Sequence, residues 1–336
     1  MSPEQRAGQL VMVGMTQSGI ATVSSSLQKY SVGAVYYAGG WKGAGTVRSA
    51  SEKLQSTVGR DGMPGLLIAA DQEGGQVQQV RGEGFPSLVS ATAQGHMTPS
   101  ARTAYAAAFA GQLRKAGVNL DLAPVADTVP ADIGAKNAPI GAFRREYGSD
   151  PKNVAAAVSD VLRGFKTVNL AATLKHFPGI GRIRQNTDYS SAGITDSVTT
   201  ATDPHLAPFQ AGIRDGARVV MMSSARYPKL DAEQPATFSS AIITDLLREK
   251  LGFEGVVISD DLHTPALVAT AVADRAVQFV QAGGDMVLTA APDLVPGLTS
   301  GLTTRMESDP AFKSTVQTAV HRVVTLKASL GLVRCS

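Results

Sequence analysis

The sequence predicts an α/β protein that folds as one (β/α)₈ TIM barrel, a single domain covering residues 1–336. Three observations support this prediction. Eight short apolar runs alternate with helix-like segments over the whole length, as strands and helices alternate in such a barrel. No shift in composition marks a domain boundary, and α/β barrels commonly reach this length as one domain. Several of the apolar runs end in polar or charged residues, which is typical of barrel strands at an active site.

Eight apolar runs, several rich in β-branched residues, predict strands that are buried on both faces. The alternative fold, an open doubly wound sheet, carries a glycine-rich nucleotide fingerprint. Gly179-Ile180-Gly181 lacks the third glycine at the required spacing, so the barrel is favoured. The predicted strands are Leu10–Val13, Ala34–Tyr37, Gly65–Ala70, Val118–Ala123, Ala171–Leu174, Ala217–Met222, Gly255–Ile258 and Asp285–Thr289.

Helix signals lie between these runs. Asp150 and Pro151 are a capping residue and a first-turn proline, and Gly283-Gly284 is a typical helix end. Two irregular stretches, Asp127–Ala142 and Gly179–Thr199, are long enough to be functional loops rather than connectors. The segments with the clearest helical character are Ala101–Lys115, Asn153–Phe165, Ser239–Leu251 and Ala271–Gln281.

The composition excludes several classes of protein. With 43% hydrophobic and 18% charged residues, the chain can bury a large core and is not expected to be disordered. The net charge is +3 and no lysine or arginine block occurs, so nucleic acid is not an expected partner. No apolar run approaches the ~18 residues of a transmembrane segment. The start at Met1 shows no signal peptide, although removal of an export signal would leave the same sequence. Cys335, the single cysteine, rules out an internal disulfide and a cysteine-based metal site.

Polar side chains follow five of the predicted strands. Active sites of barrels form at the face where the strands end, so these side chains are expected to meet at one rim. Each of them alone is explained equally well as a helix cap or a structural salt bridge, but their common position predicts a site. The residues are Asp71, Gln72 and Glu73 after the third strand, Asp121 in the fourth and Asp127 after it, Lys175 and His176 after the fifth, Ser223 and Ser224 after the sixth, and Asp260 and Asp261 after the seventh.

Three motifs carry a resemblance to a known family. The chain resembles glycoside hydrolase family 3, and most of all its single-domain bacterial β-N-acetylglucosaminidases. The resemblance runs from Gly8-Gln9-Leu10 to Leu326–Leu332, nearly the whole chain, and the family's barrel agrees with the fold predicted above. The motifs are Asp71-Gln72-Glu73-Gly74-Gly75, Lys175-His176-Phe177-Pro178-Gly179, and Leu247-Arg248 through Gly252-Phe253 into Ser259-Asp260-Asp261-Leu262.

The resemblance implies a retaining, exo-acting enzyme with Asp260 as its nucleophile. A carboxylate that stays ionised beside a sugar can attack the anomeric carbon and stabilise an oxocarbenium-like transition state. Asp261 is expected to be a supporting or capping residue, because two ionised neighbours in one pocket raise each other's pKa.

The same resemblance implies a set of residues that hold the sugar hydroxyls through charged, directional hydrogen bonds. For Lys175 two other interpretations remain: an ion pair with Asp121 or Asp71, or a Schiff-base lysine as in barrel aldolases. The Schiff base would leave the carboxylate of the seventh strand without a role. The hydroxyl-binding residues are Asp71, Arg145, Lys175 and His176, with Arg145 placed by the similarity of residues 145–151 to the family's Arg-x-Phe-Gly-x-Asp-Pro segment.

The sequence departs from the family pattern on the loop after the fifth strand. The family reads Asp-Ser-His there, and the histidine, paired with the aspartate, is the general acid/base. This chain has Asp188-Tyr189-Ser190. A serine hydroxyl, whose pKa lies far above neutral, cannot deliver a proton as imidazolium does. Ser224 likewise replaces a histidine of the sixth strand.

Three interpretations of this departure are open. Asp188 acts as the general acid itself, its pKa raised by burial when the loop closes. His263, three positions after Asp260, supplies the proton instead, although a helix-start or surface position explains this histidine equally well. Or the protein binds sugar without cleaving it, since losing general acid/base help slows a glycosidase ~10²–10⁴-fold. We expect catalysis by Asp260 and Asp188, because the nucleophile and the hydroxyl-binding set are intact.

The resemblance implies removal of terminal β-linked N-acetylglucosamine from peptidoglycan-derived or related glycans. The expected enzyme is a monomer that needs no metal and no cofactor. A β-glucosidase, a glycoside phosphorylase and a silent glycan-binding protein are the alternatives. The loop from Gly179 to Asp188 resembles actinobacterial members that are exported as lipoproteins, so the cell envelope is the expected compartment and the cytoplasm the alternative. Trp41, just after the second strand, either stacks on a sugar at the rim or packs in the interior.

Overall fold

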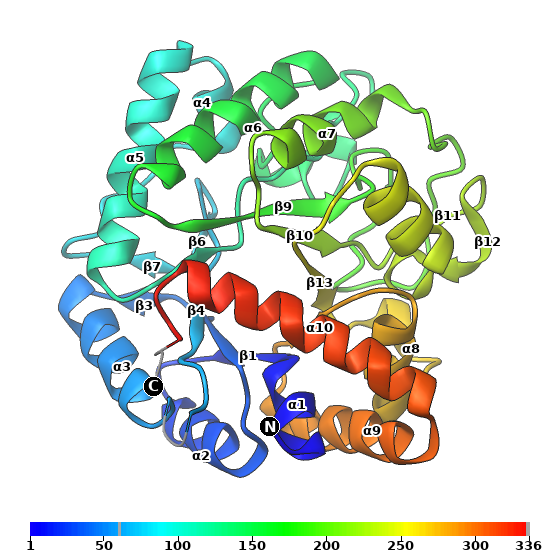
Figure 1. Cartoon of the computed structure of the whole chain (residues 1–336). Helices are drawn as coiled ribbons and strands as arrows, with labels where there is room; N and C mark the ends of the chain where they lie inside the picture. Colours follow the sequence, from blue (N-terminus) through cyan, green and yellow to red (C-terminus); the bar gives the residue numbers. More distant parts are fainter. Residues whose placement is uncertain (60–61, 334–336) are drawn as a thin grey trace.

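The computed structural model, which describes residues 1–59 and 62–333, confirms the predicted barrel. Eight parallel strands close in the order β1-β14-β13-β10-β9-β8-β4-β2, so each strand pairs with the barrel strands before and after it in the chain. Helices lie around the outside (Figure 1). The barrel strands are β1 (Val11–Met15), β2 (Ala34–Tyr37), β4 (Leu67–Ala70), β8 (Leu120–Asp121), β9 (Ala171–Phe177), β10 (Val219–Met222), β13 (Val256–Asp261) and β14 (Met286–Thr289).

The segments between the barrel strands hold the outer helices, several 3₁₀ turns and small two-stranded sheets. The helices are α1 (Pro3–Gln9), α2 (Ile20–Tyr30), α3 (Ala44–Ser56), α4 (Ala91–Gly95), α5 (Pro99–Lys115), α6 (Pro151–Lys166), α7 (Ala207–Arg214), η5 (Ala241–Lys250), α8 (Val272–Gln281), α9 (Val295–Ser308) and α10 (Pro310–Ser329). The 3₁₀ turns are η1 (Gly134–Lys136), η2 (Gly141–Phe143), η3 (Pro204–Leu206), η4 (Ala236–Phe238), η6 (Pro265–Leu267) and η7 (Pro292–Leu294). The small sheets pair β3 (Trp41–Lys42) with β7 (Val80–Arg81), β5 (Gln72–Gly74) with β6 (Val77–Gln78), and β11 (Arg226–Tyr227) with β12 (Asp231–Pro235).

All eight predicted strands are present, and the fourth is the most shortened relative to its prediction. The sequence predicts Val118–Ala123, whereas β8 is only two residues long. Pro124 has no backbone N–H, so the regular ladder stops before it. Individual bonds nevertheless continue on both sides of β8, including one from Leu122 N to Ala70 O (2.8 Å).

Three strands end later than predicted, and β1 is one of them, ending at Met15 instead of Val13. β9 continues through Lys175 and His176, and β13 continues through Asp260 and Asp261. The candidate site residues of these motifs therefore lie on the barrel itself rather than on the connections that follow it. Strand pairing continues at these positions, between Lys175 and Val125 and between Asp261 and Leu288, so these side chains start from a backbone that a neighbouring segment holds.

The four predicted helices are present as α5, α6, η5 and α8. Asp150 caps α6, since its carboxylate accepts the backbone N–H of Lys152 (2.8 Å). The predicted helix Ser239–Leu251 is η5, which is wound as a π-helix, with Leu251 N donating to Leu246 O (3.0 Å).

A buried ion cluster closes the N-terminal end of the barrel. Asp285, directly before β14, accepts hydrogen bonds from Arg248 on η5 (2.7 Å), from Arg322 on α10 (3.1 Å) and from the backbone N–H of Val257 (2.7 Å). Both carboxylate oxygens are paired, as a buried charge requires. At this end of a barrel, such contacts serve stability rather than catalysis.

Trp41 packs in the interior and does not form part of the rim. It is 2% exposed, its Nε1 donates to Met15 O (2.9 Å), and its ring lies edge-on to Tyr37 with 4.9 Å between the ring centroids. The packing interpretation of this tryptophan is therefore the correct one. Cys335 lies outside the described residues. Within the described ranges, every helix is too short or too polar to cross a bilayer.

Lys327 on α10 is buried without a carboxylate partner among the described residues. Its Nζ donates to Gln9 Oε1 (2.6 Å), and burial lowers its pKa to about 7. Desolvation disfavours the charged form of a lysine, so the folded protein holds this amine close to its neutral state.

Replacing Lys327 by methionine should remove a pH dependence of stability. In the unfolded chain the lysine pKa is ~10.4, so between about pH 7 and about pH 9 the unfolded state binds the extra proton. The free energy of unfolding of the wild type therefore rises with pH in this window, and the Lys327→Met variant lacks that increment. Urea unfolding of both proteins at the two pH values measures it. An identical pH response in both would contradict a neutral buried amine.

Candidate active site

The C-terminal ends of the barrel strands surround a cavity of about 360 Å³. It lies where active sites of barrels form, and its size falls within the ~300–1,000 Å³ of small-molecule sites. Both long loops predicted from the sequence contribute to its wall, through Pro139 and Asn186 among others. All six candidate residues line this one cavity: Asp71, Arg145, Lys175, His176, Asp188 and Asp260.

Asp260 reaches the cavity from β13. Residues 256–259 before it are buried, so the strand holds its carboxylate at a fixed point. The Oδ1 atom accepts the backbone N–H of Asp261 (2.9 Å), and the carboxylate caps no helix in the described part of the chain. Burial and the negative charge of Asp188 raise the pKa of Asp260 to about 6, and the nearby His176 opposes this rise. The carboxylate therefore titrates just below neutral pH.

Asp261 also lines the cavity, but backbone groups occupy its carboxylate. Its Oδ1 accepts the N–H of His263 (2.8 Å) and of Ala290 (3.1 Å). It thereby joins the segments that follow β13 and β14. These contacts agree with the supporting role predicted for Asp261.

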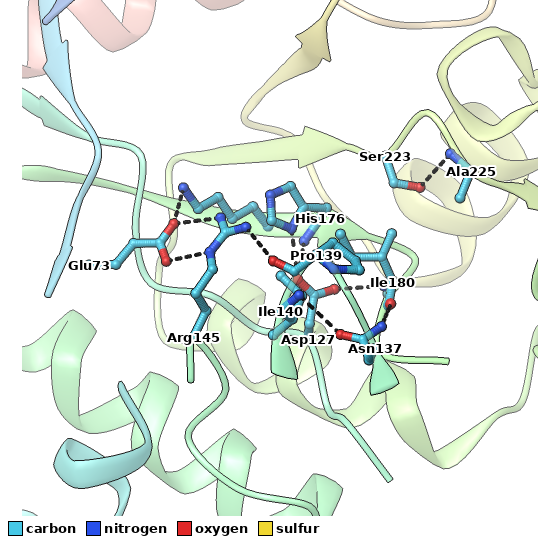
Figure 2. A network of polar contacts seen from close by, with 12 residues as sticks. Glu73, Asp127, Asn137, Pro139, Ile140, Arg145, His176, Ile180, Ser223 and Ala225 are labelled. Atoms are coloured by element: carbon cyan, nitrogen blue, oxygen red, sulfur yellow. Dashed lines mark hydrogen bonds and ion pairs between the residues drawn. The ribbon is translucent and has the colours of Figure 1, made fainter. Parts of the chain in front are cut away.

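A buried ion network forms another part of the wall. Arg145 donates to both oxygens of Glu73, from Nη2 to Oε1 (2.7 Å) and from Nε to Oε2 (2.8 Å). Figure 2 shows these two side chains facing each other. Lys175 Nζ lies 2.6 Å from Glu73 Oε1 and 2.6 Å from Asp71 Oδ1. Burial would raise the pKa of Glu73, but the charges of Arg145 and Lys175 outweigh it and lower that pKa to about 2.

The network decides between the interpretations of Lys175. Burial lowers the pKa of its ammonium group, but the carboxylates of Asp71 and Glu73 prevail and raise it. A Schiff-base lysine must lose its proton easily, so this side chain is an ion-pair partner. Asp121, the other predicted partner, instead accepts the backbone N–H of Gln72 (3.0 Å).

Both cations keep donors for a ligand. Arg145 uses Nε and Nη2 on Glu73 and one Nη1 hydrogen on Pro139 O (2.9 Å), which leaves two of its five N–H groups. Lys175 uses two of its three N–H groups on Asp71 and Glu73. The donors that remain suit the oxygen atoms of a polyhydroxylated ligand.

His176 is fixed by Asp127, which is fully buried. The Nδ1 atom of the ring lies 2.7 Å from Asp127 Oδ2, and Asp127 also accepts the backbone N–H groups of His176 (3.2 Å) and Ile180 (2.8 Å). An Nδ1–H that donates to a carboxylate leaves Nε2 as the nitrogen available to a ligand.

Asn137 holds the two long loops together. Its Nδ2 donates to the carbonyls of Ile180 (2.7 Å) and Ile183 (2.8 Å), and its Oδ1 accepts the N–H groups of Ile140 (3.0 Å) and Gly141 (2.9 Å). Figure 2 shows this amide between Ile140 and Ile180. All four of these hydrogen bonds join the buried amide to backbone groups of one loop or the other. The loops therefore approach the cavity as one unit.

The tip of the second loop is a tight turn that presents Asp188. The side chain of Asn186 accepts the N–H of Asp188 (3.0 Å), and its carbonyl accepts the N–H of Ser190 (3.0 Å). Thr264 donates to Thr187 O and so anchors the tip to the segment after β13. The carboxylate of Asp188 is exposed and accepts no hydrogen bond from the residues that the structure describes.

Ser190, Ser224 and His263 are among the predicted residues that do not line the cavity. The hydroxyl of Ser190 is occupied in the local turn by Ala192, donating to its carbonyl (2.8 Å) and accepting its N–H (3.1 Å). Ser224 is buried and lies 3.3 Å from the Thr237 hydroxyl. His263 is exposed and is absent from the cavity wall, so its proposed role as proton donor has no geometric support.

The fold and the cavity together define a class of protein. A barrel that gathers several carboxylates at its strand ends, beside charged donors, has the arrangement of enzymes that cleave glycosidic bonds. In the part of the chain described, no group of three or more His, Cys, Asp and Glu side chains is placed to hold a metal ion.

Comparison with known proteins identifies the family within that class. The model of the glycosyl hydrolase family 3 N-terminal domain matches residues 3–326, and the chain belongs to this family. A β-hexosaminidase of Stenotrophomonas maltophilia (strain K279a) is 40% identical over 237 residues, 68% of each protein. The structure of a β-N-acetylhexosaminidase from Beutenbergia cavernae DSM 12333 is 39% identical with a TM-score of 0.95, covering 98% of this chain and 99% of that one. A family 3 β-N-acetylglucosaminidase from Paenibacillus sp. str. FPU-7 is 28% identical with a TM-score of 0.86, covering 100% of this chain and 65% of that one. The protein is a glycoside hydrolase, and the family predicted from its motifs is confirmed.

Removing the charge of Asp188 should lower the pKa of Asp260. The Asp188→Asn variant keeps the shape of the side chain but removes the like charge that helps to hold the Asp260 pKa near about 6. Carboxyl-carbon NMR of aspartate-labelled protein measures the change, with Asp260→Asn used to assign the signal. Glu307→Gln, on the exposed side of α9, is the control for loss of one negative charge. An unchanged Asp260 titration in Asp188→Asn would show that the two groups do not interact.

Proposed function

We propose that the protein is a retaining exo-β-N-acetylhexosaminidase that releases N-acetylglucosamine through an aspartyl glycosyl-enzyme intermediate. One observation carries this proposal: Asp260 and Asp188, two carboxylates that interact electrostatically, line the same cavity as the hydroxyl-binding donors. The names of the relatives support the acetylated amino sugar as substrate.

In the first step, the Asp260 carboxylate attacks the anomeric carbon while the bond from this carbon to the leaving oxygen breaks. Asp188, as the carboxylic acid, donates its proton to that oxygen. In the second step, the Asp188 carboxylate removes a proton from water, and the resulting attack releases the sugar and regenerates Asp260. Two displacements at one carbon give net retention.

The electrostatic interaction between Asp260 and Asp188 suits this division of roles. Two ionised neighbours repel, so one proton held by the pair is favoured below neutral pH. In the free protein Asp188 is exposed, and a bound sugar would cover it. The covered carboxylate would then hold the proton on the side where the leaving group needs it.

Replacing Asp260 by asparagine should abolish turnover. The variant keeps the size of the side chain but removes the nucleophile, so release of the aryl group from an aryl β-N-acetylglucosaminide should fall to the background rate, as it should in Asp260→Ala. Glu307→Gln should retain wild-type rates. NMR of the sugar first released by the wild type should show the β-anomer. Undiminished release by the variants would exclude Asp260 as nucleophile, and the α-anomer would exclude retention.

Replacing Asp188 by asparagine should produce an effect that depends on the leaving group. General acid catalysis contributes ~10²–10⁴-fold in rate, so the rate of cleavage of an alkyl glycoside should fall by that factor. A dinitrophenyl group leaves without protonation, so the rate at which its glycoside forms the intermediate should fall much less. Azide, which needs no base, should then accelerate turnover of the activated substrate and give a β-glycosyl azide. A loss that is equal for all leaving groups and not rescued by azide would exclude Asp188 as the acid/base.

The alternatives are separated by simple assays. A silent glycan-binding protein, favoured by Ser190, would bind N-acetylglucosamine without turnover by the wild type. A phosphorylase would be accelerated by phosphate, and a β-glucosidase would prefer the glucoside in a direct comparison of rates.

We further propose that the substrate is peptidoglycan-derived and that the protein acts in the cell envelope as an exported lipoprotein. The support is the resemblance of the loop Gly179–Asp188 to exported members of the family. Fractionation of cells that produce the native protein tests this compartment, and recovery in the cytoplasm alone would overturn it.

A further inference from the structure

An exposed aromatic side chain stands at the mouth of the cavity. Tyr189 directly follows Asp188 and lines the cavity, yet 81% of its surface is exposed. The chain has seven tyrosines, and the other six are buried or half-buried. Aromatic rings combine a large apolar surface with little flexibility, which makes an exposed ring beside a cavity a typical ligand contact.

The turn that carries Tyr189 is fixed before any ligand binds. Its backbone N–H donates to Asn186 O (3.1 Å), and the residues on either side are held by the same asparagine. The Thr264 contact to Thr187 O ties the turn to the barrel. The ring is therefore presented by an ordered backbone, which reduces the entropy lost when a ligand packs against it.

A second aromatic ring lines the same cavity from the other loop. Phe143, at the end of η2, is 38% exposed, and its N–H donates to Ile140 O (3.1 Å). Asn137 accepts the N–H of Ile140 and donates to Ile180 O, so one buried amide fixes the loops that carry both rings (Figure 2).

We propose that Tyr189, together with Phe143, forms a platform that selects a pyranose ring as the leaving group. This inference rests on the proposed function: if Asp188 protonates the glycosidic oxygen, the next residue in the turn lies on the leaving-group side. A pyranose has an apolar C–H face that packs against an aromatic ring, while its hydroxyls stay in water. The platform thus determines specificity for the leaving group, the part of the substrate that lies beyond the released sugar.

The test compares two substrates that differ only in the leaving group, N,N′-diacetylchitobiose and methyl β-N-acetylglucosaminide. The readout is the ratio of their kcat/KM values. In Tyr189→Ala this ratio should fall about three- to tenfold, as expected for losing one aromatic contact. Tyr189→Phe should keep the wild-type ratio, and Phe143→Ala should lower it.

The matched control is Val198→Ala. Val198 lies on the same loop and is 52% exposed, but it is absent from the cavity wall, so this variant should keep the wild-type ratio. Thermal unfolding checks that the exposed ring was not needed for stability. An unchanged ratio in Tyr189→Ala would overturn the platform, as would equal losses on both substrates. A fall in Tyr189→Phe as large as in Tyr189→Ala would assign the effect to the hydroxyl group instead.

A binding experiment separates failure of the platform from failure of the proposed function. Calorimetry on Asp260→Asn, which should not turn over substrate, should show tighter binding of the disaccharide than of N-acetylglucosamine, and adding Tyr189→Ala should remove most of that difference. If the wild type cleaves neither substrate, the proposed hydrolysis fails, but the calorimetric difference still decides the platform. Equal affinity for both sugars would refute it.

Discussion

The carboxylate of Glu73 is the group on which the candidate site depends. It is buried, and it binds Arg145 through two hydrogen bonds and Lys175 through one. A buried carboxylate is costly unless it is paired, and each of these cations would be equally costly without it. Together they form a network with a net positive charge, which Asp71 then balances at the cavity wall. The result is a set of charged donors with fixed directions, prepared before a ligand arrives.

The charged side chains at the cavity form two groups with different properties, one around Glu73 and one around Asp260. Around Glu73, opposite charges lie in contact and keep each other ionised, so their state does not change near neutral pH. Around Asp260, like charges lie close together and a partly buried carboxylate titrates just below neutral pH. The first arrangement is suited to holding hydroxyl groups and the second to moving a proton. The two arrangements lie in one cavity, so donors of fixed charge and a titrating carboxylate face the same space.

The substitution of serine for the family's histidine has a local structural consequence. In this chain Ser190 closes the turn on Ala192, and Asn186 holds the turn from its other side. The loop is thus stabilised by short-range hydrogen bonds of its own, and Asn137 positions its base from the neighbouring loop. Asp188 is left at the tip, and its carboxylate accepts no hydrogen bond from residues 1–59 and 62–333.

The sequence by itself determined the architecture and the polar residues at the ends of the strands. Apolar runs predict buried strands, because a parallel strand is covered on both faces. Polar motifs that follow these runs predict the residues at the C-terminal rim of the barrel. This was sufficient to locate the eight strands and four of the six candidate residues, Asp71, Lys175, His176 and Asp260, whereas Arg145 and Asp188 came from the resemblance to the family. It was not sufficient for the ends of β8, β9 and β13, which depend on where the neighbouring strands still offer hydrogen-bonding partners.

Only the tertiary structure decided which side chains support the site. Arg145 lies 72 residues from Glu73 in the chain, and Asn137 lies 43 residues from Ile180. No local pattern encodes such pairings, since they arise when separate loops and strands are brought to one end of the barrel. Tertiary structure also decided which residues stay outside the cavity. Ser224 and His263 follow barrel strands in the chain, as cavity residues do. The side chain of Ser224 instead contacts Thr237, and that of His263 is exposed to solvent. Sequence specifies which chemical groups are available, whereas contact between them is a property of the closed barrel.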